Sequence, residues 1–267
     1  MQKQTKTTII SLTLSALIFL LLGWYVYNDF LLEEDLENTT PSETTKDPIE
    51  IIDDSQLEFE YVNDVSSLDV PIPDLDRGFD FGENVPDDLK LRLITSLEEI
   101  LSRLKNNPGS FNDWLDLASN RKLIGDFEGA VEAWEYASLL DPSNAIPLSN
   151  IGNLYHYYTK DYKKAEEYFL KALERDPKMI FIYTNLHELY KYSYKQETNK
   201  AADILIKGLE VNQDDISLLV NLANYYKEKS DSKNATIYYE KASEQAILIN
   251  DMNLYFELQK EISLFGL

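Results

Sequence analysis

The chain has 267 residues with 47 acidic and 25 basic side chains, a formal net charge of −22 at pH 7, no cysteine and only two histidines. The lack of cysteine excludes disulfides, thiolate metal sites and cysteine nucleophiles, and so few histidines lead us to expect no metal centre and no cofactor. The acidic balance argues against nucleic acid as a partner, since binding phosphates requires a basic surface.

The acidic and basic residues divide the chain into three parts. Residues 1–27 carry only Lys3 and Lys6, and residues 28–86 carry 18 acidic residues against two basic ones. Residues 87–267 are more balanced, with 29 acidic and 21 basic residues. This change of composition predicts a short tail, an acidic linker and a folded domain.

An uncharged, apolar stretch follows the tail of residues 1–6 and occupies residues 7–28. A helix of this length rises about 30 Å, which matches the hydrocarbon core of a bilayer. Basic residues precede it and acidic residues follow it, so we expect a single-pass anchor in the cell membrane with a cytoplasmic N-terminus and an extracytoplasmic domain. The alternative is a cleaved signal peptide, whose apolar region is usually shorter and ends at small residues.

Residues 29–86 have the composition of an acidic, largely disordered linker. Acids mix first with Pro, Ser and Thr, which bury too little apolar area to offset the entropy of ordering. Further on, Leu57, Phe59 and Tyr61 alternate with Glu58 and Glu60. Such alternation also occurs in segments that dock onto partners, so the linker is either a solvated spacer or a docking segment, with the protein's own domain as one target.

The remaining chain predicts helices throughout, with a repeated pattern between two flanking helices. Residues 87–110 hold a helix with apolar residues at helical spacing, and residues 250–267 hold another. Between them, residues 111–249 divide into four similar units: 111–144, 145–179, 180–215 and 216–249. Each unit has a large residue at its fourth position, namely Trp114, Leu148, Tyr183 and Leu219. The eighth position is small in three units, where Ala118, Gly152 and Ala223 stand, and His187 is the exception.

These units resemble the tetratricopeptide repeat, a pair of antiparallel helices of about 34 residues. The resemblance implies an all-α, right-handed α-solenoid of about four helix pairs with capping helices at both ends. The first helix of each unit is called helix A here and the second helix B. The third unit departs from the pattern because it has two extra residues before its helix B. We expect His187 to be buried and hydrogen-bonded, holding two helices apart.

The resemblance also implies that helices A line a concave groove with positions 2, 5, 9, 12 and 13. Position 12 is Lys122, His156, Lys191 and Lys227, a basic or titratable residue in every unit, and aromatic residues adjoin it. This row has two interpretations. It can reflect only the lysines that surface helices carry for solubility, or it can line a groove for an acidic or partly apolar peptide, the protein's own linker included. The candidate binding residues are Lys122, Asn153, His156, Tyr157, Phe181, Glu188, Lys191, Tyr192, Asn224 and Lys227.

No sequence motif supports catalysis. His187–Glu188 begins like a helical zinc-protease motif, but the position of the second histidine is Lys191, and no serine nucleophile elbow is present. We therefore expect a protein that is not an enzyme. Two functions remain: an anchored scaffold that binds protein or peptide partners in its groove, or a structural subunit whose solenoid packs permanently in a membrane complex or with itself. The oligomeric state is not determined by the sequence.

Overall fold

A computed structural model describes residues 70–79, 81, 86–196 and 198–265, and the apolar stretch at residues 7–28 lies outside them. The described residues form ten α-helices, two of which continue into a π-helical turn, and contain no strand, so the all-α class is confirmed there. None of these helices is both long and apolar enough to cross a membrane.

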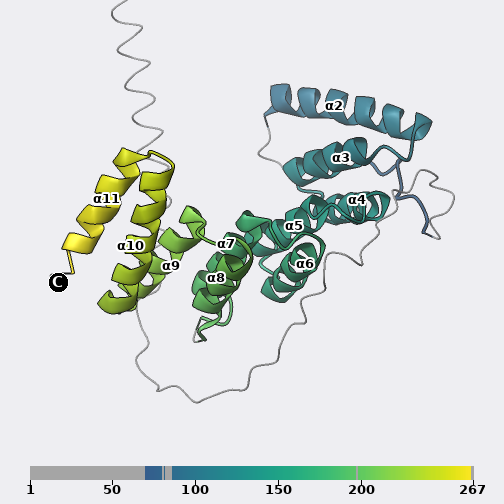
Figure 1. The fold of residues 1–267 in the computed structure, drawn as a ribbon. Coiled ribbons are helices and arrows are strands. Elements are labelled where there is room, and N and C mark those ends of the chain that lie inside the picture. The colour runs from purple at the N-terminus through teal and green to yellow at the C-terminus, as the bar shows by residue number, and fades with distance from the viewer. Residues whose placement is uncertain (1–69, 80, 82–85, 197, 266–267) are drawn as a thin grey trace, which may run out of the picture. The chain divides into compact units, whose positions relative to one another are not determined.

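The helices follow one another as antiparallel hairpins (Figure 1). The flanking helices are α2 (Asp87–Asn106) and α11 (Met252–Ser263). The helices A are α3 (Phe111–Ile124), α5 (Ile146–Asn153) with π-turn η3 (Leu154–Tyr158), α7 (Ile180–Glu188) with π-turn η4 (Leu189–Ser193), and α9 (Ile216–Glu228). The helices B are α4 (Phe127–Leu140), α6 (Tyr162–Arg175), α8 (Lys200–Val211) and α10 (Ser232–Leu248).

The turn from helix A to helix B uses the same local chemistry in three units. One residue takes the left-handed backbone conformation, and the aspartate after it caps helix B by accepting a hydrogen bond from a backbone N–H in the first turn. The left-handed residues are Gly125, Lys160 and Ser230, with φ of 89°, 57° and 59°. The caps are Asp126, Asp161 and Asp231. Only the third unit lacks such a cap, since the side chain of Asn199 makes no capping hydrogen bond.

The core consists of small residues packed against large ones, as the repeat pattern predicts. The large residues at position 4, from Trp114 to Leu219, are all 5% exposed or less. Gly152 in α5 shows why position 8 is small: a Cβ added there would lie 2.6 Å from the Phe169 ring of α6. Helices A and B therefore approach so closely that one partner in each layer must be small.

His187 takes this small position in the third unit, and the prediction of a buried, hydrogen-bonded histidine is confirmed. Its side chain is 4% exposed, and its Nδ1 lies 2.7 Å from the carbonyl oxygen of Ala201 in α8. Where the second unit sets Gly152 against Phe169, the third has His187 on helix A and Leu205 at the equivalent place on helix B. The third unit thus has two residues of intermediate size where the second has a glycine and a phenylalanine.

The two π-turns account for the unequal lengths of the units. The units of 35 and 36 residues are the second and third, and each carries a π-turn at the end of its helix A. A π-turn bonds residue i to i+5, so it takes up one extra residue without ending the helix. The N–H groups of Thr159 and Tyr194 accordingly donate to Leu154 and Leu189, five residues earlier. The second extra residue of the third unit falls in the loop before α8.

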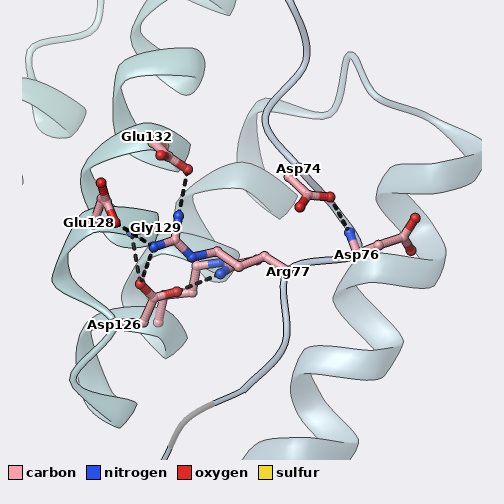
Figure 2. A network of polar contacts seen from close by, with 8 residues as sticks. Asp74, Asp76, Arg77, Asp126, Glu128, Gly129 and Glu132 are labelled. Carbon is pink, nitrogen blue, oxygen red and sulfur yellow. Dashed lines mark hydrogen bonds and ion pairs between the residues drawn. The ribbon is translucent and has the colours of Figure 1, made fainter.

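Residues 70–79 and 81, within the predicted linker 29–86, lie against the domain. Leu75, Phe79 and Phe81 are partly buried on its core, and Lys105 of α2 pairs with Asp76 at 2.6 Å. Arg77 lies among three carboxylates at the start of α4 (Figure 2). These are Asp126 at 3.2 Å, Glu128 at 2.8 Å and Glu132 at 3.1 Å. Part of the predicted linker therefore packs on the folded domain, beginning no later than Leu75.

Asp126 joins this docked segment to the interior of the first unit. Besides capping α4, it pairs with Arg121 of α3 at 2.5 Å, and Arg121 is only 2% exposed. Gly129 leaves room for the pair, because a Cβ there would lie 2.8 Å from Nη1 of Arg121 and closer still to Asp126. Such a buried guanidinium requires its carboxylate partner, so Asp126 serves the cap, the buried pair and the docked segment together.

We expect Gly152→Ala to destabilise the domain by about 1–3 kcal/mol, because the added methyl group overlaps the Phe169 ring. Urea denaturation followed by circular dichroism measures the change. Gly78→Ala is the control, since no atom lies within 4 Å of the Cβ it would add. Equal denaturation midpoints for the two variants would show that the helices do not approach this closely.

We expect Asp126→Ala to destabilise the domain by about 3–5 kcal/mol, because it leaves the buried Arg121 without its carboxylate. Asp161→Ala is the matched control: it removes the equivalent cap of α6 but no buried partner, and we expect it to cost about 1 kcal/mol. The same denaturation measurement compares them. A difference near zero would contradict the role of the buried pair.

Candidate functional site

The candidate binding residues lie along helices A and their π-turns, but they differ in exposure. Tyr157, Phe181 and Tyr192 are exposed by 49%, 42% and 53%. Glu188 and Lys227 are also exposed, and Lys122, Asn153, Lys191 and Asn224 are half-buried. His156 is buried, with 5% of its surface exposed. The structure thus divides the set into an outward group and an inward group.

The π-turns explain this division. Each π-turn, at positions 10–14 of its unit, contains one extra residue. A residue in or after the π-turn therefore faces the same way as the residue one position earlier in the first and fourth units. His156 and Lys191 consequently take the inward place that the buried Arg121 has in the first unit, and the Lys191 side chain is only 11% exposed. The predicted basic row at position 12 is therefore not a row of equivalent, outward-facing side chains.

The outward row instead reads Lys122, Tyr157, Tyr192 and Lys227. The two tyrosines follow the inward residues His156 and Lys191 directly in the sequence. Exposed apolar side chains at positions 2 and 13 extend this surface, namely Leu123 at 64%, Ile146 at 40% and Phe181. We call this row and its apolar neighbours the A-helix surface. It offers aromatic faces at its middle and lysines at its ends.

Polar contacts between successive units hold several candidate residues in place. Lys191 pairs with Glu228 of α9 at 2.6 Å, and Lys227 pairs with Glu261 of α11 at 2.5 Å. Burial opposes the charge of Lys191, but its bonds to Glu228 and Tyr192 outweigh burial and raise its pKa. A ligand carboxylate would thus have to displace Glu228 or Glu261 to reach these two lysines.

The second and third units are joined in the same manner. The Tyr157 hydroxyl donates to Glu188 at 2.6 Å, and burial together with this carboxylate raises the tyrosine pKa well above its usual value. Asn185 donates to the Asn153 side chain at 3.0 Å. Nε2 of His156 lies 3.2 Å from the Ser193 hydroxyl. In the fourth unit, Asn224 accepts a hydrogen bond from the hydroxyl of Tyr239 within the same hairpin. Both candidate asparagines, Asn153 and Asn224, therefore already have a hydrogen-bond partner within the domain.

Lys122 differs from the other lysines of the row. It lies 5.5 Å from the centre of the Tyr158 ring, and within the described residues no carboxylate is within ion-pair distance of it. The first unit therefore presents a cation to a ligand more readily than the third or fourth does.

The A-helix surface includes a small cavity of about 290 Å³. It lies between the third and fourth units, and its walls include Lys191, Tyr192, Tyr225 and Glu228. A cavity of this size accommodates a side chain rather than a cofactor. In the described part of the chain, no three His, Cys, Asp or Glu residues are grouped to hold a metal ion. The arrangement is suited to contact with a peptide.

Sequence reasoning missed three features of the site. Arg121 was not expected to be buried, and the π-turns were not expected at all. Arg77 was also missed, although a single arginine in an acidic segment, between Leu75 and Phe79, was a signal for docking. The exposed Leu123 and Ile146 occupy positions 13 and 2, which the repeat resemblance assigns to the groove.

Comparison with known families agrees with the helical pairs seen here. Residues 148–179 and 216–246 match the model of the tetratricopeptide repeat family, and these stretches fall in the second and fourth units. Each matched stretch covers most of one helix pair, α5 with α6 or α9 with α10, so these two units are similar to tetratricopeptide repeats. The first and third units lie outside the matched stretches. No curated protein matches the chain in sequence.

Several solved structures are similar to this chain at low identity. MamA is 18% identical with a TM-score of 0.48, over 62% of this chain and 98% of that one. PilF of Pseudomonas aeruginosa is 18% identical with a TM-score of 0.46, over 65% and 84%. YrrB, described as a TPR protein with an unusual peptide-binding site, is 17% identical with a TM-score of 0.42, over 62% and 91%. None of these similarities assigns a partner to this chain.

We expect the stability of the domain to fall as the pH drops below about 6.5, the ordinary pKa of histidine. Burial lowers the pKa of both His156 and His187 in the folded protein, so the unfolded chain binds protons more readily and acid favours unfolding. The stabilisation is complete above about pH 6.5 and is lost as the pH falls through the folded pKa values. Denaturation midpoints measured between pH 7.5 and about 5 test this, before most carboxylates titrate.

The variant His187→Asn provides the control for the pH dependence. An asparagine side chain also donates to the Ala201 carbonyl but does not titrate. Its midpoint should vary less with pH over the same interval than that of the unsubstituted chain. An unchanged slope would contradict a contribution from His187.

Proposed function

We propose that this protein is a membrane-anchored scaffold that binds a protein or peptide partner on the A-helix surface. Residues 7–28 serve as a single anchor in the cell membrane, with the N-terminus in the cytoplasm and the repeats outside it. The anchor is supported by its uncharged length and by the charges on either side of it. The role is binding, without catalysis and without a cofactor.

The observation that carries this proposal is the recurrence of exposed apolar side chains at equivalent places on helices A. Exposed aromatic groups gathered on one surface of a repeat protein are unusual unless they contact a partner. Tyr157, Phe181 and Tyr192 supply large, rigid contact areas. Aromatic residues of this kind contribute much of the binding energy at interfaces. Lys122, without a carboxylate partner in the described part, favours a partner with an acidic residue near that end.

A second function is favoured by a different apolar group. Residues at the end of α10 and along α11 are exposed, among them Leu248 at 75%, Ile249 at 62% and Phe256 at 63%. The end of a solenoid that packs against another protein, or against a second copy, would have such a surface. A structural subunit of a membrane or envelope complex is therefore the alternative.

Paired variants distinguish the two functions. We expect alanine at Tyr157, Phe181 and Tyr192 together to reduce photocrosslinked partners in intact cells by at least about tenfold, because aromatic anchors carry most of the binding energy. The matched variant has alanine at Leu248, Ile249 and Phe256. Partners and oligomeric mass are measured for both, with circular dichroism to verify folding.

Loss of partners only in the second variant, together with a change in oligomeric mass, would favour the structural subunit and overturn the scaffold proposal. The anchor is tested separately by an alkaline wash of membranes. Release of the full-length chain into the soluble fraction would contradict it.

A further inference from the structure

A second groove lies on the helices B, between the docked segment and the first two units. Its volume is about 840 Å³. Residues 70–74 form one wall, and α4 and α6, with Leu148 of α5, form the other. The segment thus does not fill the surface on which it lies but borders an open groove there.

The groove is lined by apolar groups that face water. Val70 and Ile72 of the segment are each 44% exposed, and Leu139 on the opposite wall is half-buried. Covering them would remove apolar area from water, which is favourable by about 25 cal/mol per Å². An extended chain with apolar side chains on one side suits this shape.

The polar groups of the groove favour an occupant that brings acceptors. Arg175 is half-buried and bonds to the backbone carbonyls of Ser138 and Asn144, but no carboxylate of the described residues is within ion-pair distance of it. Burial lowers the pKa of Arg175, and the more distant Asp141 only partly opposes this effect. Tyr136 also lines the groove, and its hydroxyl is buried with no hydrogen-bond partner in the described part of the chain.

The carboxylates of the groove do not supply that counter-ion. Glu132 pairs with Arg77, and Glu135 accepts from the hydroxyl of Tyr168. Glu174 stands exposed to water, and Asp74 of the segment accepts a hydrogen bond from the backbone N–H of Asp76. Arg175 is therefore the cation that an acidic occupant would contact, because Lys171, which also lines the groove, pairs with Glu167 at 2.8 Å.

The chain itself supplies a matching segment at the groove. Residues 57–69 precede Val70 directly, so they continue the docked segment from its end. They alternate apolar and acidic side chains at Leu57–Tyr61, and they carry four acidic residues and no basic one. Thirteen residues reach at most about 47 Å when extended, which suffices to run beside residues 70–74. The covalent link gives them an effective concentration that a separate peptide rarely attains.

We propose that residues 57–69 dock in this groove, with their acidic side chains toward Arg175 and their apolar side chains on Ile72 and Leu139. The linker then joins the domain on the helix-B side, which leaves the A-helix surface open. The inference does not rest on the proposed function, because it concerns other helices and requires neither a partner nor a membrane.

The natural absence of cysteine makes a direct test possible. The full chain is prepared as Phe59→Cys with Lys171→Cys, and separately as Phe59→Cys with Phe181→Cys, whose second cysteine lies on the A-helix surface. The rate of disulfide formation is measured by mass spectrometry. We expect the Lys171→Cys pair to close within one chain at least about tenfold faster, because docking raises the local concentration of the thiols.

Substitution of Arg175 tests the polar contact. Arg175→Gln should slow closure of the Lys171→Cys pair severalfold, whereas Lys178→Gln, which removes an exposed charge nearby, should not. Equal rates for the two cysteine pairs would overturn the proposal, as would faster closure with Phe181→Cys, which would place the linker on the A-helix surface. Disulfides formed mainly between two chains would assign the groove to a second copy and would equally overturn it.

Discussion

The close approach of the two helices in each pair is the constraint on which this structure depends. Gly152 leaves no space for a methyl group beside Phe169, whereas the third unit has His187 and Leu205 at the equivalent places. Because close-packed interiors tolerate little change in volume, a large residue on one helix requires a small one on the other. In the third unit two residues of intermediate size take these places, and the stack continues although the sequence departs from the pattern.

The surface available to a partner follows from the same constraint. An insertion in a helix A cannot widen the packed layers, so each of two helices takes up one residue in a π-turn at its end. The π-turns turn His156 and Lys191 inward and leave Tyr157 and Tyr192 outward. The inward residues then bond across to the next unit, as Lys191 does to Glu228. The residues at position 12 therefore do not form a row of free cations. His156, Lys191 and Lys227 instead contact the unit or helix that follows their own.

In the docked segment, a single arginine pairs with several of the chain's many carboxylates. Arg77 lies among three carboxylates at the start of α4, and one of these, Asp126, also pairs with the buried Arg121. Carboxylates near a helix N-terminus are stabilised by the helix dipole and the free N–H groups. An arginine from the linker then offsets their mutual repulsion. The end of the linker, from Leu75 to Phe79, thus belongs to the same folded body as the first unit.

The sequence by itself determined the all-α class, the order of helix pairs and the buried character of His187. Those features depend on local spacing and on residue size, which a single chain displays directly. The tertiary structure alone decided which candidate residues face outward, because rotation along a helix accumulates and one inserted residue changes it. It also decided that Arg77 reaches Asp126, some fifty positions later in the chain, since long-range ion pairs leave no periodic trace in the sequence. The helix pairs could therefore be predicted from local sequence, whereas the set of residues exposed on the binding surface depends on how the units pack.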